Sequence, residues 1–374
     1  MATFQLYFDG ASADDALYDS ISTLEVEENA DLPSALRMTL PVSTDPSGDL
    51  AFVNDARFKP FANVAVAVSA DGETKHCIFD GYVLSHKLHL DSGVTSSTLE
   101  VWAQDATWMM NLEEKVREWA DVTDADVAGT IFGEYGITPA GDNSSDDSPS
   151  HTEDKHTLMQ RGSDIQFLRM LARRNGKLCR VSCTDTPGDR TGWFAKPAVD
   201  GDPSVTITLN ADAPAVEALD FEWDVTRPSA VKARQALFDD DTPTGVSGDA
   251  TDSGIAPLDE RDLATFAGQT MTVLLTAPVD DAGELMLRAQ SVLREGGWFA
   301  RCEGETDVAR LQDVIRAGTI VQIDAAGSLN SGKYFVWTVR HTIAADSHRM
   351  RFTLVRNAVG PEPSGGGGLL GGLL

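Results

Sequence analysis

The sequence predicts a mainly β protein in which an α+β segment separates two β-rich parts. Residues 4–8 and 21–29 alternate apolar and polar side chains, as strands with one buried face do. Residues 63–105 predict three or four further strands, separated by the turn sequences Asp71-Gly72 and Asp91-Ser92-Gly93. Short strands with a turn every 8–12 residues or so are typical of an antiparallel barrel or sandwich.

The middle of the chain predicts helices. Two of them are indicated by apolar side chains at every fourth position, namely Trp108, Leu112 and Val116, and then Val127, Ile131 and Tyr135. Residues 140–154 are polar and predict a solvated loop.

The clearest helix signal lies at residues 163–176. Ser163 and Asp164 are preferred N-cap residues, and Gly176 is a typical stop after the two arginines of the last turn. One face of this helix carries the apolar side chains Ile165, Leu168, Leu171 and Ala172. Strands are expected to follow at residues 178–183 and 192–197.

Strand patterns return from about residue 204. The acidic, polar stretch 239–262 predicts a mobile loop. A helix at 281–294 is indicated by the capping-box pattern Asp281-x-x-Glu284 and by the stop Gly296-Gly297. The other predicted elements are strands at residues 205–209, 216–225, 319–323, 333–343 and 349–357.

Two stretches, starting at Gly81 and Gly332, share a pattern. Each has a glycine, an aromatic–valine strand, a histidine, an acidic turn and a second alternating strand, although the histidines differ in register by about two residues. The pattern predicts a duplicated β unit; the alternative is chance similarity between two hairpins.

Composition bounds the function. The 374 residues include 58 acidic and 30 basic side chains, for a net charge of −28, which disfavours direct nucleic-acid binding. Two interpretations of this charge stay open. It keeps the protein soluble, as in a saline cytoplasm, or it forms a negatively charged surface that polyanions and acidic cargo pass without binding. No apolar run is long enough for a membrane helix, and the N-terminus does not resemble a secretory signal, so synthesis in the cytoplasm is expected.

The chemistry-bearing residues predict no catalytic site, no cofactor and no metal. The glycines between residues 327 and 333 have phosphate-loop spacing, but Tyr334 replaces the Mg²⁺-binding hydroxyl and a strand follows where a helix should begin. The seven histidines form no HExxH motif, and no Gly-x-Ser-x-Gly turn is present. The four cysteines lack zinc-ligand spacing and are expected to be buried and reduced.

Two segments of the chain carry further motifs. The residues of the first motif are Gln160, Ser163, Asp164, Phe167, Leu168, Leu171, Ala172 and Gly176. Those of the second are Gly332, Tyr334, Val336, His341, Arg356 and Asn357. Both segments resemble the phage late control D proteins, which share their base with the type VI secretion spike protein and with baseplate hubs of myophages and R-type pyocins. With the β/helix/β layout, the resemblance covers most of residues 1–360.

The resemblance implies two tail-tube-like antiparallel β-barrels and a small α/β domain, assembling as a pseudo-sixfold homotrimer. Six similar barrels would match a hexameric inner tube protein on one side and a trimeric spike on the other. The expected domains are a first barrel at 1–115, an α/β insert at 116–203, a second barrel at 204–360 and a Gly/Leu-rich flexible tail at 361–374. The implied function is a structural hub in a virion or contractile particle, in contact with other baseplate proteins.

The chain departs from spike-fused relatives because no further domain follows Ala358, so a separate spike protein is expected. Leu369, Leu370, Leu373 and Leu374 on their glycine linker are a possible partner-binding tail; the alternative is a disordered end. Two other functions stay open: a tail-associated cell-wall hydrolase, and a generic acidic β-rich binding protein.

Overall fold

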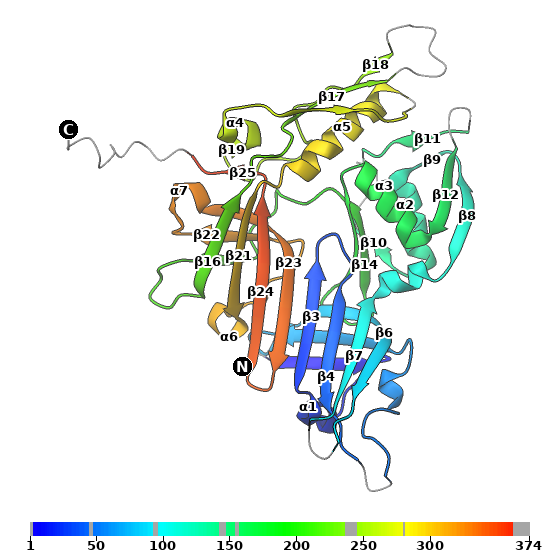
Figure 1. Cartoon of the computed structure of the whole chain (residues 1–374), viewed down its shortest axis with the longest axis vertical. Coiled ribbons are helices and arrows are strands. Elements are labelled where there is room, and N and C mark those ends of the chain that lie inside the picture. The colour runs from blue at the N-terminus through cyan, green and yellow to red at the C-terminus, as the bar shows by residue number, and fades with distance from the viewer. Residues whose placement is uncertain are drawn as a thin grey trace, which may run out of the picture.

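The computed structural model describes residues 3–44, 48–92, 96–141, 147–153, 157–235, 245–279 and 281–361. The predicted leucine tail, with Leu369, Leu370, Leu373 and Leu374, lies outside the described residues. The prediction of a mainly β fold with an α+β insert is confirmed (Figure 1).

The elements follow one another in three parts. The first part contains β1 (Thr3–Phe8), β2 (Ala11–Ser12), α1 (Asp15–Ser20), β3 (Thr23–Asn29), β4 (Ala35–Pro41), the 3-10 helix η1 (Ala56–Phe58), β5 (Asn63–Ser69), β6 (His76–His89) and β7 (Thr98–Asp105). The insert contains η2 (Ala106–Asn111), β8 (Glu114–Trp119), β9 (Val122–Thr123), α2 (Asp124–Glu134), β10 (Thr138–Pro139), β11 (Ser150–His151), β12 (Leu158–Ser163), α3 (Asp164–Arg174), β13 (Leu178–Cys183) and β14 (Arg190–Ala195).

The third part is the longest. It contains β15 (Val205–Thr208), β16 (Val216–Trp223), β17 (Ala230–Gln235), β18 (Val246–Ser247), β19 (Arg261–Asp262), α4 (Leu263–Ala267), β20 (Thr272–Leu275), α5 (Ala282–Gly296), β21 (Ala300–Asp307), α6 (Val308–Leu311), β22 (Ile320–Asp324), α7 (Gly327–Asn330), β23 (Gly332–Ala344), β24 (Ser347–Arg356) and β25 (Ala358–Val359).

Two sets of six strands have the same order. In the first barrel the order is β1-β5-β6-β7-β4-β3, and in the second barrel it is β15-β22-β23-β24-β21-β16. When the strands of each set are numbered along the chain, both orders read 1-4-5-6-3-2. One pairing differs in direction: β1 and β5 are antiparallel, whereas β15 and β22 are parallel. The two sets are joined edge to edge by β3 and β23 and, with the short strand β2 beside β1, form one 13-stranded sheet.

The register of the two barrels also agrees. The β6·β7 ladder skips Leu84 after Val83, and the β23·β24 ladder skips Trp337 after Val336, so the two bulges mark equivalent positions. On the other side of these strands, the Val83 oxygen accepts from Phe61 N at 2.8 Å and the Val336 oxygen accepts from Gly318 N at 2.8 Å. The duplication that the sequence predicted is therefore present, but Gly81 corresponds to Tyr334 rather than to Gly332.

The bulges also identify equivalent residues in the last strand of each barrel, because the paired residues can be traced from β7 through β4 to β3 and from β24 through β21 to β16. There, Leu24-Glu25-Val26-Glu27 of β3 corresponds to Leu219-Asp220-Phe221-Glu222 of β16. Both stretches alternate an apolar side chain with an acidic one. The apolar residues of both barrels face one shared core, which contains Leu24 and Val26 at 0% exposure and has Leu219 and Phe221 packed against it.

The insert has a separate core, formed by α2, α3 and the strands around them. Its N-terminal part contradicts the helix predicted from Trp108, Leu112 and Val116. Residues 106–111 form a 3-10 turn and Val116 lies in strand β8 with 78% of its side chain exposed, so its fourfold spacing is coincidental. The helices expected around Val127 and at residues 163–176 are α2 and α3.

Residues 224–299 were not distinguished from the second barrel in the sequence. They form a small unit in which α5 packs on β17 and β18, with its own apolar clusters. The loop expected to be mobile at 239–262 is fixed over its described part: Ala250 bridges to Val231, and β19 pairs with β25. The polar composition predicted mobility, but this segment is held by backbone pairing and by contacts such as the ion pair between Asp259 and Arg356.

A substitution of Gly81 tests how closely the backbones of β6 and β7 approach each other. A Cβ on Gly81 would lie 2.1 Å from the Gln104 oxygen of β7 and 2.7 Å from the Phe79 ring. We expect Gly81→Ala to lower the free energy of unfolding by about 1–3 kcal/mol through overpacking. Urea denaturation measures the effect.

Gly133 is the matched control, because it lies exposed in α2 and a Cβ there would meet nothing within 4 Å. Gly133→Ala should raise the free energy of unfolding by up to about 1 kcal/mol. Equal effects of the two substitutions would contradict the close approach of the strands.

Candidate assembly interface

The joint between the two barrels is an antiparallel strand pair. Residues 24–29 of β3 lie opposite residues 338–343 of β23, from the pair Leu24 and Ile343 to the pair Asn29 and Thr338. Just beyond, the Ala30 amide donates to the Trp337 oxygen at the bulge, at 2.9 Å. On the outer face, Arg340 donates to Glu27 with an N–O distance of 2.6 Å.

A buried polar cluster lies beneath this joint. Glu28 is 4% exposed and accepts from Arg316 Nε at 2.8 and 3.0 Å, while His341 Nε2 lies 3.5 Å from it. Burial opposes the charge of Glu28, but Arg316 and His341 outweigh it and lower its pKa to about 2. Arg316 also donates to the Cys77 oxygen at 2.8 Å, so the cluster ties β3, β6 and the segment before β22 together.

Sequence reasoning missed this cluster, although a signal was present. Alternation places Leu24 and Val26 on the inward face of β3, and the next inward position is Glu28. A carboxylate at a position that the pattern assigns to the core predicts a buried cationic partner.

His348 continues the cluster into β24. Its Nε2 lies 3.0 Å from His341 Nδ1, and burial together with His341 lowers the pKa of His348 to about 3. An unfolded histidine has a pKa of about 6.5. Between pH 6.5 and 3 the unfolded chain therefore binds more protons than the folded chain, and stability falls as the pH is lowered.

We expect His348→Gln to flatten this dependence. The melting temperature of the wild-type chain should drop more steeply between pH 7 and pH 4.5 than that of the variant. Measurement at pH 8, where the imidazole of His348 is neutral in both the folded and the unfolded chain, separates the packing effect of the substitution. Parallel curves for the two proteins would show that His348 does not contribute.

The first set of motif residues lies in the insert. Ser163 caps α3 with a capping box that includes Gln166. Asp164, fully buried, accepts from Lys115 Nζ at 2.6 Å, from Tyr135 Oη at 2.7 Å and from Gln160 Nε2 at 2.6 Å. These bonds fix the start of α3 against β8 and α2.

The apolar members of the same motif form the core of the insert: Phe167, Leu168, Leu171 and Ala172 are all buried in it. Gly176 follows the helix at φ +60°, a conformation that favours glycine, and a Cβ there would lie 2.8 Å from Ser291 of α5. Arg294 of α5 donates to the Asn175 and Gly176 oxygens at 2.8 and 3.1 Å. This motif therefore joins the insert to the unit at 224–299.

The second set lies in the second barrel. Gly332, Tyr334, Val336 and His341 all belong to β23. Arg356, at 0% exposure, pairs with Asp259, donates to the Ser331 oxygen at 3.1 Å and lies over the Tyr334 ring. Asn357 accepts from the Leu258 amide at 2.9 Å. These residues anchor the segment before β19; the structure does not bring them together with the first set.

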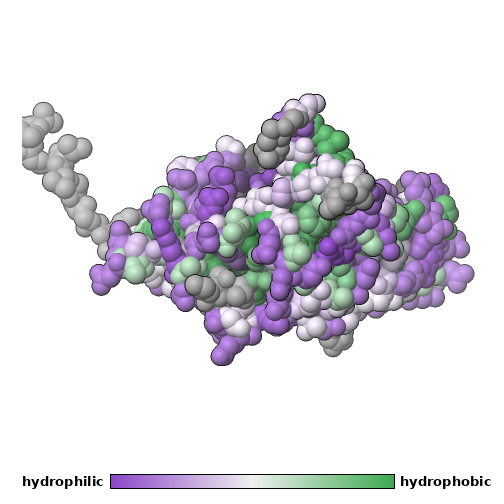
Figure 2. Space-filling view, turned by 90° about the horizontal axis from the view of Figure 1, so that it is seen from below, coloured by the Kyte–Doolittle hydropathy of each residue, from purple (hydrophilic) through white to green (hydrophobic). Residues whose placement is uncertain are grey.

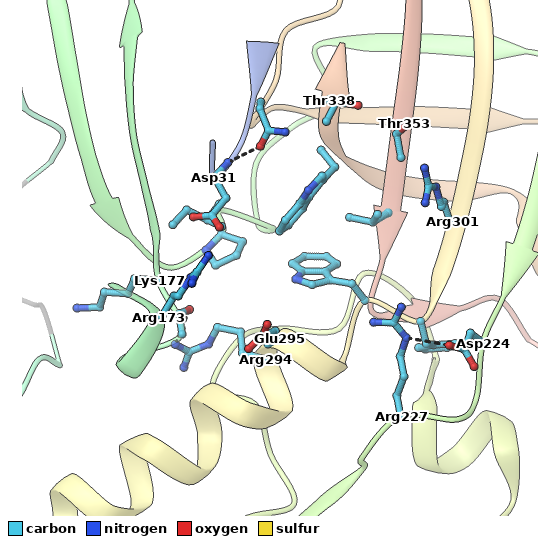
Figure 3. Close-up of a pocket in the computed structure, with 18 of the residues that line it drawn as sticks. Asp31, Arg173, Lys177, Asp224, Arg227, Arg294, Glu295, Arg301, Thr338 and Thr353 are labelled. Carbon is cyan, nitrogen blue, oxygen red and sulfur yellow. Dashed lines mark hydrogen bonds and ion pairs between the residues drawn. The ribbon is translucent and has the colours of Figure 1, made fainter. Parts of the chain in front are cut away.

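A cleft of about 830 Å³ lies where the end of α3, α5 and the outer face of the second barrel meet (Figure 3). Its wall carries several cations, and three of them have partners close by. Arg294 binds backbone oxygens, as described, and Arg227 lies 3.5 Å from Asp224. Lys177 donates to Ser148 at 2.6 Å. Of these three cations, Arg294 joins the unit at 224–299 to the insert, whereas Arg227 and Lys177 have their partners within their own part of the chain.

The surface and the remaining reactive groups add constraints. Apolar residues interrupt the mostly hydrophilic surface in several places (Figure 2). All four cysteines are buried and free, and burial raises the pKa of the Cys179 and Cys302 thiols to about 12. Among the described residues, no His, Cys, Asp and Glu side chains gather as a metal site. Within the same residues, no helix has the length and apolar character needed to span a membrane.

The family model described as the Alg8 N-terminal domain matches residues 1–345. The chain belongs to this family. None of the curated proteins matches the chain by sequence. The family description differs from the late control D proteins, to which the two motifs are similar.

Solved structures with the same fold include two tail proteins. The 43 kDa tail protein of prophage MuSo2 from Shewanella oneidensis aligns with a TM-score of 0.67 at 15% identity, over 96% of this chain and 100% of that one. A tail protein from Neisseria meningitidis aligns with a TM-score of 0.66 at 12% identity, over 95% and 97%.

A third likeness is to a type VI secretion component of E. coli, described as structurally similar to two T4 bacteriophage tail proteins. It aligns with a TM-score of 0.55 at 13% identity, over 96% of this chain and 79% of that one. At these identities the likeness concerns the fold, and this chain has the fold of those proteins over almost its whole length.

Proposed function

We propose that this chain is a structural hub of a phage-like tail or contractile injection system, related to the late control D hubs. Three copies form a ring that adapts a hexameric inner tube to a trimeric spike. The observation that carries the proposal is the pair of barrels with one strand order and one register, joined edge to edge. The fold shared with tail proteins supports it.

The physical reason is a symmetry mismatch. A threefold ring can contact a sixfold tube evenly when each subunit presents two similar surfaces. The joint between β3 and β23 sets the two barrels side by side within a chain, so three chains supply six barrels. The hub is made in the cytoplasm and ends up in the assembled particle, in contact with tube, spike and baseplate proteins.

The negative charge suits the same role. With 58 acidic against 30 basic residues, a ring of this protein repels polyanions and acidic proteins that pass its centre. Direct binding of nucleic acid is not part of the proposal.

The oligomeric state and the position in the particle test the proposal. Native mass spectrometry of the purified chain should show a trimer, and electron microscopy with a labelled chain should place it between tube and spike. A chain that stays monomeric at high concentration and does not associate with the tube protein would overturn the hub function.

We propose further that the hub is not an enzyme. Purified protein incubated with peptidoglycan should release no soluble fragments above a heat-denatured control. Release of fragments by the folded chain would instead favour the alternative of a cell-wall hydrolase.

A further inference from the structure

We propose that neighbouring copies pair the outer edge of β16 with the second half of β6, in the register that β3 and β23 have inside one chain. This inference deepens the proposed hub function and rests on it for the number of copies. It specifies which strand edges meet, in which direction and with which residues opposite each other.

Both edges lack a backbone partner in the described part of the chain. β16 pairs with β21 along one edge, and its other edge is open. β6 pairs with β5 only up to Tyr82, so the edge of residues 85–89 that faces away from β7 is open as well. Unpaired edges of this kind are templates for an added strand.

The equivalence of the two barrels assigns these edges to each other. β16 occupies in the second barrel the position of β3 in the first, and β6 occupies in the first barrel the position of β23 in the second. Inside the chain, the outer edge of β3 binds the part of β23 that follows the bulge. The outer edge of β16 would bind the part of β6 that follows its bulge at Leu84.

Residues at the joint between β3 and β23 are buried, whereas the equivalent residues at the open edges of β16 and β6 are exposed. This difference is expected if the strand that covers the open edges belongs to another copy of the chain. Ile343 is 3% exposed at the inner joint, whereas the equivalent residue Leu90 is 55% exposed. Glu28 is 4% exposed, whereas its equivalent Trp223 is 54% exposed. Large apolar side chains thus stand at the positions that the inner joint buries.

The register fixes the contacts on the inward face. Transfer of the β3·β23 register sets three pairs opposite each other: Leu219 with Leu90, Phe221 with Leu88, and Trp223 with His86. All three pairs are apolar or aromatic. They would extend the shared core of the barrels across the boundary between two copies.

The outward face matches in charge. The inner joint carries the Glu27–Arg340 ion pair, and the transferred register sets Glu222 opposite Lys87 at the same position. The next outward pair is Asp220 with His89. A shift by one residue would turn the apolar side chains of one strand away from the core, so the register is well defined.

The direction of the contact is the one that a ring of identical copies requires. β16 lies at one side of the molecule and β6 at the opposite side (Figure 1), so the interface is head-to-tail. A head-to-tail contact forms a ring when its rotation closes. If each step between copies repeats the step between barrels, and that step is a sixth of a turn, three chains close a ring of six barrels.

Cysteine cross-linking tests the register in the full-length chain. Residues opposite each other in an antiparallel pair have Cα and Cβ separations that suit a disulfide. Lys87→Cys with Glu222→Cys should give covalent trimers on mild oxidation, seen on a non-reducing gel. The native cysteines are buried and do not compete. The matched control, Lys87→Cys with Asp220→Cys, is two residues out of register and should cross-link at least 10-fold more slowly.

Charge reversal tests the same contact without cross-linking. Lys87→Glu and Glu222→Lys should each weaken trimer formation about 10-fold or more in sedimentation experiments, and the double variant should return to within about 3-fold of the wild type. Both side chains are exposed, so circular dichroism should show unchanged folding of each monomer.

The outcomes separate this inference from the hub function. A wild-type trimer that neither cross-links through residues 87 and 222 nor responds to the charge reversals would overturn the proposed pairing while leaving the hub function standing. The absence of any trimer would overturn both. Cross-linking confined to the matched pair, with recovery in the double variant, supports the pairing.

Discussion

Substitution of Arg316 by alanine should lower the free energy of unfolding by about 3–5 kcal/mol. Arg316 is the cation that faces Glu28. Its Nε donates to that carboxylate at 2.8 and 3.0 Å, and its Nη2 lies 2.8 Å from Glu28 Oε1. Its removal leaves a buried carboxylate without compensation, which is one of the most costly changes in a protein interior. Urea denaturation followed by circular dichroism measures the loss.

Arg340→Ala is the matched control for this prediction. Arg340 of β23 forms an ion pair with Glu27, the neighbour of Glu28 in β3, at a distance of 2.6 Å, but both side chains are exposed. Exposed pairs contribute about 0–1 kcal/mol, so the control should have a small effect. The double variant Glu28→Leu with Arg316→Met should be less destabilised than Arg316→Ala, because it leaves no unpaired charge. Similar losses for Arg316→Ala and Arg340→Ala would contradict the role given to burial.

The second large effect is expected at Asp124, the first residue of α2. Asp124 is fully buried and accepts from His151 Nε2 at 2.9 Å, from Arg174 Nε at 3.0 Å and from Asn175 Nδ2 at 2.6 Å. Burial opposes its charge, but His151 and Arg174 outweigh burial and lower the pKa of Asp124. Asp124→Ala leaves these donors unpaired and should cost about 3–5 kcal/mol.

Asp126, two residues along the same helix, supplies the comparison. It completes the capping box with Thr123 and is exposed. Asp126→Ala removes ordinary hydrogen bonds and should cost about 0.5–1.5 kcal/mol. Thermal unfolding of the two variants should therefore differ clearly. If Asp126→Ala is as damaging as Asp124→Ala, the buried cluster does not hold the insert together.

Local signals in the sequence identified the helices with caps. Ser163, Asp281 and Gly176 have the cap roles that their residue types predict, because capping depends on a few neighbouring backbone groups. The stripe of Trp108, Leu112 and Val116 failed because spacing alone does not make a helix: Asp105 caps only a short 3-10 turn, and Val116 lies in a strand.

For the motif residues, too, the sequence identified single positions but not their distant partners. The sequence identified Asp164 and Arg356 as notable, but not their partners, which lie far away in the chain at Lys115 and Asp259. Glu28 was detectable as a break in strand alternation, whereas its pairing with Arg316 depends on the folded joint.

Pattern and composition by themselves determined the β-rich class, the helical caps, the acidic surface and a hint of duplication, because each depends on side chains close together in the chain. The tertiary structure decided the register of the two barrels, their joint through β3 and β23, and the open edges of β16 and β6. These features depend on which distant strands pair with each other. The pairing is stabilised because it buries the apolar side chains of both barrels in one shared core.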